Sequence, residues 1–204
     1  PGPSEVEEWQ LGDAVLMPGL VNTHAHLELT ALRGLVRDRP FSRWIVSVRG
    51  IKEALTAADF RASARWGVLE SFAAGITTTG DTGSSGEAAI ALAELGARGV
   101  AYQEVFGPDP AQCEAALAEL ERALDRLWPF TSARVEVGVS PHAPYTVSTV
   151  LLHNVAAFAR ARWTRLLLLQ TIVAGFVAVT VVVFLGRCWF PVMTQAVQGL
   201  SGFG

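Results

Sequence analysis

The sequence has 204 residues, of which 17% are charged and 50% are hydrophobic, and its formal net charge is −3. This length suits one ordinary domain. The acidic surplus argues against nucleic acid as the main partner, because phosphate binding requires a basic surplus. Two cysteines, Cys113 and Cys188, lie far apart. They exclude a disulfide framework and a cysteine zinc site, and with no signal-peptide pattern we expect a reducing, cytoplasmic setting.

Strands and helices are predicted to alternate along most of the chain. The expected strands span 20–24, 76–79, 100–106 and 134–139, with helices at 51–74, 87–95, 111–127 and 147–161 and polar loops at 80–86 and 140–146. This alternation is typical of parallel βαβ units with right-handed crossovers. In α/β folds the segments that follow the strands carry function, and the polar residues of this chain gather there.

The charge pattern divides the chain into two pieces. All 19 acidic residues lie at or before Glu136, and the charged residues after it are arginines. Residues 166–185 carry no formal charge and would form a helix of about 30 Å, the thickness of a bilayer core. We therefore expect an apolar tail over 163–204 with a candidate transmembrane helix at 166–185. Flanking arginines would place the preceding residues on the cytoplasmic face. The alternative is two buried strands, because valine is abundant here.

The pair His24 and His26 is the strongest chemical signal in the sequence. Residues two apart on a strand point to the same side, so two imidazoles at the end of a predicted strand can converge on one cation. Imidazole is a ligand of zinc and of iron. The alternative is a pair of polar residues that only end the strand.

Three carboxylates are weaker candidates for substrate binding. Glu28 lies two residues after His26 and could face the cleft, or serve as a helix cap or in a salt bridge. Asp81 follows the second predicted strand and could instead form a turn or cap a helix. Glu104 lies inside the third predicted strand, where a buried carboxylate needs a partner.

Three blocks of the sequence resemble the amidohydrolase superfamily, in particular its aminohydrolase branch of S-adenosylhomocysteine and aminofutalosine deaminases and chlorohydrolases. Residues 17–34 are similar to the first barrel strand and its loop, 75–79 to the second strand and 140–148 to a later block. The resemblance covers roughly residues 11–160. It implies a metal-dependent (β/α)₈ barrel, in which zinc or iron activates water to deaminate an aminated heterocycle or nucleoside.

Such a barrel typically needs ~250 residues, so we expect only part of one, about four βα units over residues 17–162. Residues 1–16 would be a remnant of the β-sandwich that precedes the barrel in this family. The resemblance also assigns His24 and His26 as the first two metal ligands. It assigns His142 as a substrate contact, although that residue could also be a loop histidine held between two prolines.

The departures from the family pattern limit the expected activity. The family's later histidines, glutamate and aspartate are missing, and the apolar tail stands where the fifth strand is expected. We therefore expect weak metal binding and little turnover. The alternative is a non-enzymatic, membrane-anchored fragment or a gene fusion, since the tail faintly resembles an ATP synthase protein I membrane segment. We also expect that the open edge of the fourth strand could pair with a second copy.

Overall fold

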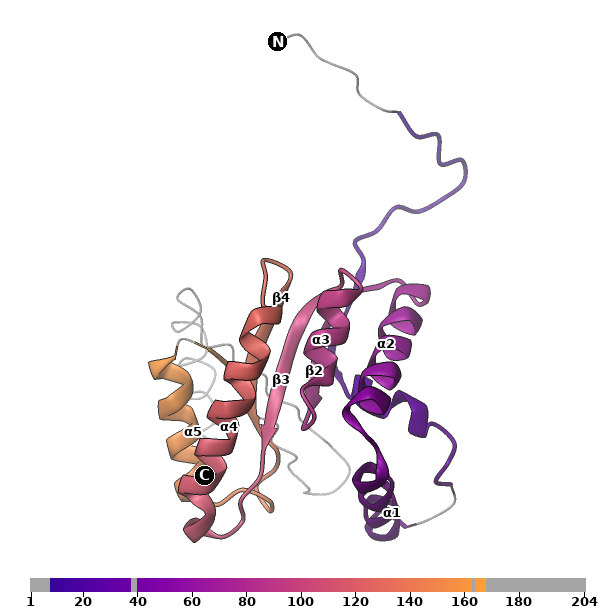
Figure 1. The fold of residues 1–204 in the computed structure, drawn as a ribbon. Coiled ribbons are helices and arrows are strands. Elements are labelled where there is room, and N and C mark those ends of the chain that lie inside the picture. The colour runs from indigo at the N-terminus through magenta and orange to yellow at the C-terminus, as the bar shows by residue number, and fades with distance from the viewer. Residues whose placement is uncertain (1–7, 38–39, 163, 168–204) are drawn as a thin grey trace, which may run out of the picture.

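The computed structural model describes residues 8–37, 40–162 and 164–167. Residues 8–19 form no helix or strand, lie exposed and extend away from the remaining elements (Figure 1). Residues 8–16, part of the expected β-sandwich remnant, thus form no strand in the described structure.

The described strands form one parallel sheet in the order β1-β2-β3-β4-β5. The strands are β1 (Leu20–Ala25), β2 (Ile76–Gly83), β3 (Arg98–Val105), β4 (Val135–Pro141) and β5 (Arg165–Leu166). Each strand pairs with the next one along the chain, and helices cross between them. The predicted α/β class is confirmed, and five parallel strands in this order are consistent with part of a (β/α)₈ barrel.

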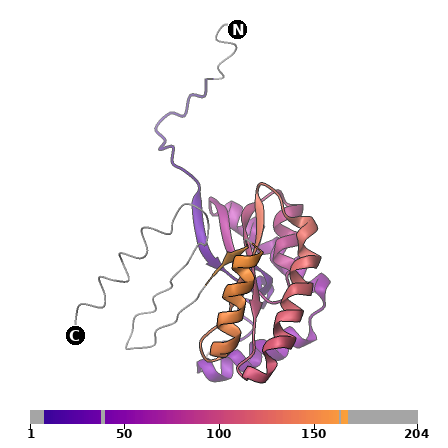
Figure 2. The same cartoon turned by 90° about the vertical axis from the view of Figure 1, so that its left-hand side faces the viewer.

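Helices cover one face of this sheet (Figures 1 and 2). The helices are α1 (Phe41–Ala54), α2 (Ala57–Ala73), α3 (Glu87–Glu94), α4 (Cys113–Leu127) and α5 (Thr149–Ala161), with short 3₁₀ turns η1 (Leu27–Leu32), η2 (Pro110–Gln112) and η3 (Trp128–Phe130). Two clusters of buried apolar side chains lie between the sheet and α2–α5. Helix α1 lies at the carboxyl ends of the strands, and Val48 is its one buried residue.

The helix expected over 51–74 is two helices. Helix α1 ends before Leu55, and Thr56 begins α2 with a capping box in which it exchanges hydrogen bonds with Asp59. These bonds satisfy two of the free donors at a helix start, so the chain begins a new helix here instead of continuing the first.

Strand β2 is longer than predicted and includes residues 80–83, which were expected to be a loop. A β-carbon on Gly80 would lie 2.8 Å from the carbonyl oxygen of Thr23 on β1. Glycine therefore permits the close approach of β1 and β2 at this point. The glycines that predicted a loop at residues 80–83 belong to a strand.

The start of the apolar tail is a strand, which corrects the prediction of a helix beginning at residue 166. Leu167 donates its backbone N–H to the carbonyl of Val139 at 2.9 Å, and β5 pairs with β4 at Gly138 and Val139. The tail thus supplies the fifth strand, and β4 is not an open edge. Residues 168–185 lie outside the described residues. Within the described part of the chain, no helix has both the length and the apolar character needed to cross a membrane.

Candidate functional site

His24 in β1 and His26, directly after this strand, converge at the carboxyl end of the sheet. Ala25, between them, is paired with Asp81 and packs against the helix-covered core. Because successive side chains of a strand alternate, His24 lies on the opposite, inner face, and the ring of His26 lies beside it. Their ring centroids are 4.9 Å apart in an edge-to-face arrangement with an interplanar angle of 88°.

The pKa values of both imidazoles are lowered, which favours the neutral form. Burial is the main cause that lowers the pKa of His24, and the neighbouring His26 adds to it. Burial likewise lowers the pKa of His26, although its hydrogen bond to the backbone of Thr82 opposes this. The neutral imidazole is the form that binds metal ions.

The histidine pair fits two positions of a metal site but does not complete one. Nδ1 of His24 is buried and has no hydrogen-bond partner among the described residues, as expected of a nitrogen that binds a metal ion. However, the described residues hold no group of three or more His, Cys, Asp or Glu side chains that could bind a metal ion. Zinc sites usually use three or four protein ligands, so a donor set of two is incomplete.

Glu28 is fully buried and forms the salt bridge that was one of its two expected structural roles. Its Oε1 lies 2.8 Å from Nζ of Lys52, which also donates to Oγ of Ser84 at 2.9 Å. The backbone N–H groups of Ser84 and Ser85 donate to the same carboxylate at 3.3 and 3.0 Å. Burial would raise the pKa of Glu28, but the Lys52 ammonium and the Ser85 donors outweigh it and hold this pKa below its usual value.

Lys52 is a site residue that the sequence did not indicate. It lies in the last turn of α1, 24 residues from Glu28 in the chain, and no spacing pattern links the two. Its charge acts on the pKa values of His26, Glu104 and His142. The charge of Lys52 therefore acts on several of the candidate side chains, in addition to its ion pair with Glu28.

Asp81 lies on the helix-covered face of the sheet, opposite the face of His24 and Glu104. It pairs with Ala25 in the sheet, so it faces the helices, and its Oδ1 accepts the backbone N–H of Leu27 at 2.6 Å. Complete burial raises its pKa to about 8. In this position the carboxyl group anchors the start of η1.

Glu104 and His142 lie together on the inner face at the carboxyl ends of β3 and β4. Oε1 of Glu104 is 3.9 Å from Nε2 of His142, whose Nδ1 is 2.8 Å from Oγ1 of Thr146. Burial raises the pKa of Glu104 to about 7. Burial also lowers the pKa of His142, and electrostatic interactions with His26 and Lys52 lower it further. Glu104 and His142 thus form a second pair of titratable groups at the carboxyl end of the sheet.

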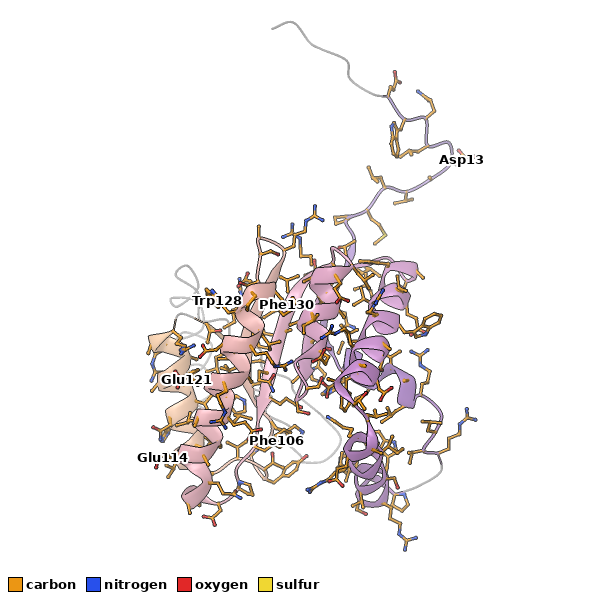
Figure 3. All side chains as sticks on the ribbon, viewed as in Figure 1. Asp13, Phe106, Glu114, Glu121, Trp128 and Phe130 are labelled. Atoms are coloured by element: carbon orange, nitrogen blue, oxygen red, sulfur yellow. The ribbon has the colours of Figure 1, made fainter. Side chains whose placement is uncertain are left out.

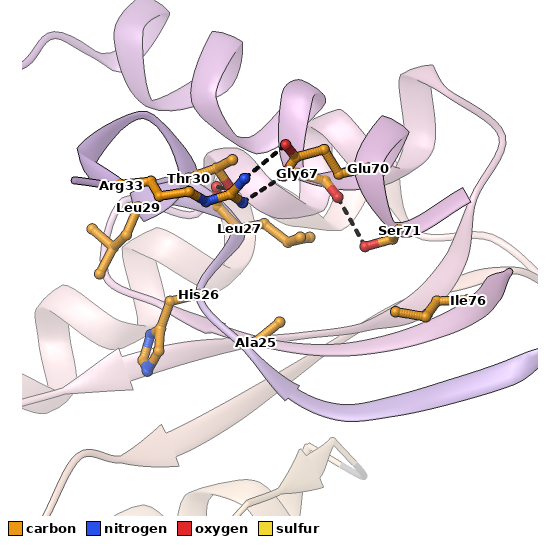
Figure 4. Close-up of a pocket in the computed structure, with 10 residues that line it drawn as sticks. All are labelled: Ala25, His26, Leu27, Leu29, Thr30, Arg33, Gly67, Glu70, Ser71 and Ile76. Carbon is orange, nitrogen blue, oxygen red and sulfur yellow. Dashed lines mark hydrogen bonds and ion pairs between the residues drawn. The ribbon is translucent and has the colours of Figure 1, made fainter. Parts of the chain in front are cut away.

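A cavity lies beside these residues (Figure 4). It measures about 390 Å³ and is formed by β1, η1 and α2, with the Arg33–Glu70 ion pair on its wall. His26 is the one candidate residue that lines it, and its imidazole points away from the Arg33–Glu70 pair. The candidate side chains therefore converge outside this cavity.

A parallel sheet with helices on one face and a histidine pair at its carboxyl end defines a class, the α/β proteins whose sites lie at the carboxyl ends of barrel strands. The comparison with protein families identifies the member of this class. The family model described as the amidohydrolase family matches residues 15–167, and the chain belongs to this family.

Similar proteins include two deaminases. The 5'-deoxyadenosine deaminase of Methanothermobacter thermautotrophicus is 34% identical over 148 residues, which are 71% of this chain and 35% of that protein. The 5-methylthioadenosine/S-adenosylhomocysteine deaminase of Haloarcula marismortui is 36% identical over 155 residues, 72% of this chain and 35% of that protein. The chain thus spans about a third of the length of the curated relatives it matches.

Solved structures share the fold. An adenosine deaminase from Xanthomonas campestris, described with bound zinc, superposes with a TM-score of 0.64 at 24% identity. The match covers 74% of this chain and 36% of that one. This likeness supports the assignment of the sheet as part of a barrel.

Proposed function

We propose that this chain carries part of the active site of a metal-dependent hydrolase that deaminates an adenosine-type nucleoside. The observation that carries the proposal is the convergence of His24 and His26, with ring centroids 4.9 Å apart and a buried Nδ1 without a partner in the described chain. Relatives that are named as deaminases of adenosine derivatives support the substrate class.

Each group has a role in this proposal. His24 and His26 would hold zinc or iron, which supplies water activated for attack near neutral pH. Glu104, with a pKa of about 7, can accept or release a proton in the neutral range. His142 lies 3.9 Å from that carboxylate and would contact the substrate. Lys52 holds Glu28 and thereby fixes the chain that follows the histidine pair.

The first test is zinc binding by the purified chain. Because two ligands are fewer than zinc sites use, we expect zinc to bind in excess metal and to be lost on dialysis. His24→Ala and His26→Ala should abolish this binding. His153→Ala is the matched control, because His153 is exposed on α5. Zinc binding that survives both site substitutions would overturn the proposed metal role.

The second readout is ammonia release from adenosine and 5'-deoxyadenosine with zinc present. We expect little turnover from the chain as it stands, since the described ligand set is incomplete. One tightly held zinc per chain together with robust turnover would contradict the conclusion that the metal-ligand set is incomplete.

A further inference from the structure

Three arginines lie where three neighbouring strands begin. Arg98 is the first residue of β3, Arg134 directly precedes β4, and Arg165 is the first residue of β5. They therefore lie at the amino ends of these strands. Figure 3 labels Phe106, which follows β3, at the opposite end of the sheet, where α1 lies. The arginines have no part in the roles proposed above.

All three arginine side chains line one cavity, which measures about 260 Å³. Tyr102 and Glu136 also line it. These two residues alternate with Ala101 and Val135, which pack on the helix side, so the cavity lies on the inner face of the sheet. Pockets for drug-sized ligands typically measure about 300–1,000 Å³, and this cavity therefore suits a smaller molecule.

The positive charge in this cavity is only partly neutralised. Both carboxylate oxygens of Glu136 accept hydrogen bonds from Arg165, at 2.5 and 2.8 Å. Arg98 and Arg134 form no ion pair with a carboxylate of the described residues. Nη1 of Arg134 donates to the carbonyl of Gly96 at 3.3 Å. Two guanidinium groups thus have no counter-charge in the described part of the chain.

Arg98 and Arg134 are neighbours across β3 and β4. The backbone N–H of Gly99 donates to the carbonyl of Arg134 at 2.9 Å, and Gly99 pairs with Val135. The residues directly before this pair, Arg98 and Arg134, therefore lie side by side. Neighbouring like charges repel each other, so an anion between them would stabilise the arrangement. Guanidinium groups bind phosphate through charge-assisted hydrogen bonds that are often bidentate.

Tyr102 supplies a further hydrogen-bond donor on the wall of this cavity. The residue is 3% exposed, and its hydroxyl forms no hydrogen bond with the described residues. A buried tyrosine hydroxyl usually has a hydrogen-bond partner. Gly138 on β4 leaves room for the ring, because a β-carbon there would lie 2.6 Å from it. The hydroxyl can therefore donate to an oxyanion held by the arginines.

We infer that this cavity binds a small phosphate-type oxyanion, either inorganic phosphate or the phosphate group of a small monoester, through Arg98, Arg134 and Tyr102. One bound phosphate would neutralise both guanidinium groups and give the Tyr102 hydroxyl its partner. The site lies at the opposite end of the sheet from the histidine pair, so it does not depend on the proposed metal role.

The test is calorimetric titration of the full chain with inorganic phosphate and, separately, with ribose 5-phosphate, without added metal and at a constant ionic strength set by chloride. Arg98→Gln and Arg134→Gln should each weaken binding by about 10- to 100-fold, because each loses a charge-assisted hydrogen bond. Tyr102→Phe keeps the ring and loses the hydroxyl, so it should weaken binding by about 2- to 10-fold. The probe that binds more tightly shows whether the site takes free phosphate or a monoester.

Arg122→Gln is the matched control, because Arg122 is exposed on α4 and does not line the cavity. It should bind both probes as the unmodified chain does. Without phosphate, Arg98→Gln should keep or raise the midpoint of urea unfolding, since it removes the repulsion from Arg134. A lower midpoint would show that Arg98 has a structural partner and would overturn the inference. Equal losses of affinity for Arg98→Gln and Arg122→Gln, or no binding of either probe at millimolar concentration, would do the same.

Discussion

Asp81 and Glu104 show how one residue's position in a strand decides its chemistry. Burial raises the pKa of both carboxyls, to about 8 and about 7. Asp81 faces the helices and holds the N–H of Leu27, while Glu104 faces the inner side and His142. A raised pKa therefore belongs to a structural anchor in the case of Asp81 and to a candidate proton-transfer group in the case of Glu104.

Asp81 should make the folded state less stable as the pH rises. Its pKa is raised from 3.8 to about 8, so the folded state binds this proton more tightly than the unfolded state. The resulting stability is fully present below about pH 4 and is lost as the pH rises through about 8, by up to about 1.4 kcal/mol per pH unit.

Asp81→Asn should flatten this dependence, because its amide oxygen can still accept the Leu27 N–H but does not ionise. Urea unfolding across this pH range measures the slope. Asp13→Asn, at an exposed carboxyl, should leave the slope unchanged. Parallel profiles for Asp81→Asn and the unmodified chain would show that Asp81 ionises normally.

The sequence predicted the histidine pair but not the side on which Asp81 lies. The spacing of His24 and His26 was sufficient to predict that their side chains lie close together, although His26 follows the last residue of β1. The orientation of Asp81 depends on whether residue 81 belongs to a strand, and the glycines around it indicated a loop. Its pairing with Ala25 then follows from the register of β1 and β2.

At the scale of elements, one buried ion pair joins three segments. Glu28 belongs to η1, Lys52 to α1, and Ser84 and Ser85 follow β2. Because Val48 is the one buried residue of α1, this ion pair is a main attachment of the helix to the site.

Lys52→Met should destabilise the protein by about 3–5 kcal/mol, because it leaves the buried Glu28 carboxylate without its cation. The side chains of Lys52 and Glu28 are 24% and 1% exposed. Arg49→Met in the same helix is the control, and its pair with Glu53 is 83% and 65% exposed. We expect that change to cost less than about 1 kcal/mol. Equal losses of unfolding free energy for the two variants would contradict the assigned role of Lys52.

Element types were largely predictable, and element ends were not. Hydrophobic periodicity identified the helix at 111–127, which matches α4 after the turn η2. The sequence did contain a signal for the helix break at Leu55, because Thr56 and Asp59 have the spacing of a capping box. The hydrophobic periodicity continues across this position and therefore predicted one helix instead of two. Lys52 had no such signal, since only the folded chain brings it to Glu28.

For the whole molecule, alternation of strands and helices was sufficient to predict a parallel sheet. Helices cover one face of the sheet (Figure 2). The opposite, inner face carries the histidine pair, Glu104 and His142. Hydropathy could not assign the apolar stretch after residue 165, because a buried strand and a membrane helix are both rich in valine and leucine. The pairing with β4 shows that the first residues of this stretch form a strand.

Leu167 provides the test of that assignment. Its side chain is 0% exposed, and its N–H donates to Val139. Leu167→Ala should therefore lower the free energy of unfolding by about 2–5 kcal/mol, as for other buried leucines. Leu16→Ala is the control, since Leu16 is 85% exposed and its loss should cost less than about 0.5 kcal/mol. If residue 167 instead lay in a membrane helix, urea unfolding of the preceding residues in detergent would be the same with leucine and with alanine. A clear loss on Leu167→Ala would place the start of the apolar stretch within the folded core.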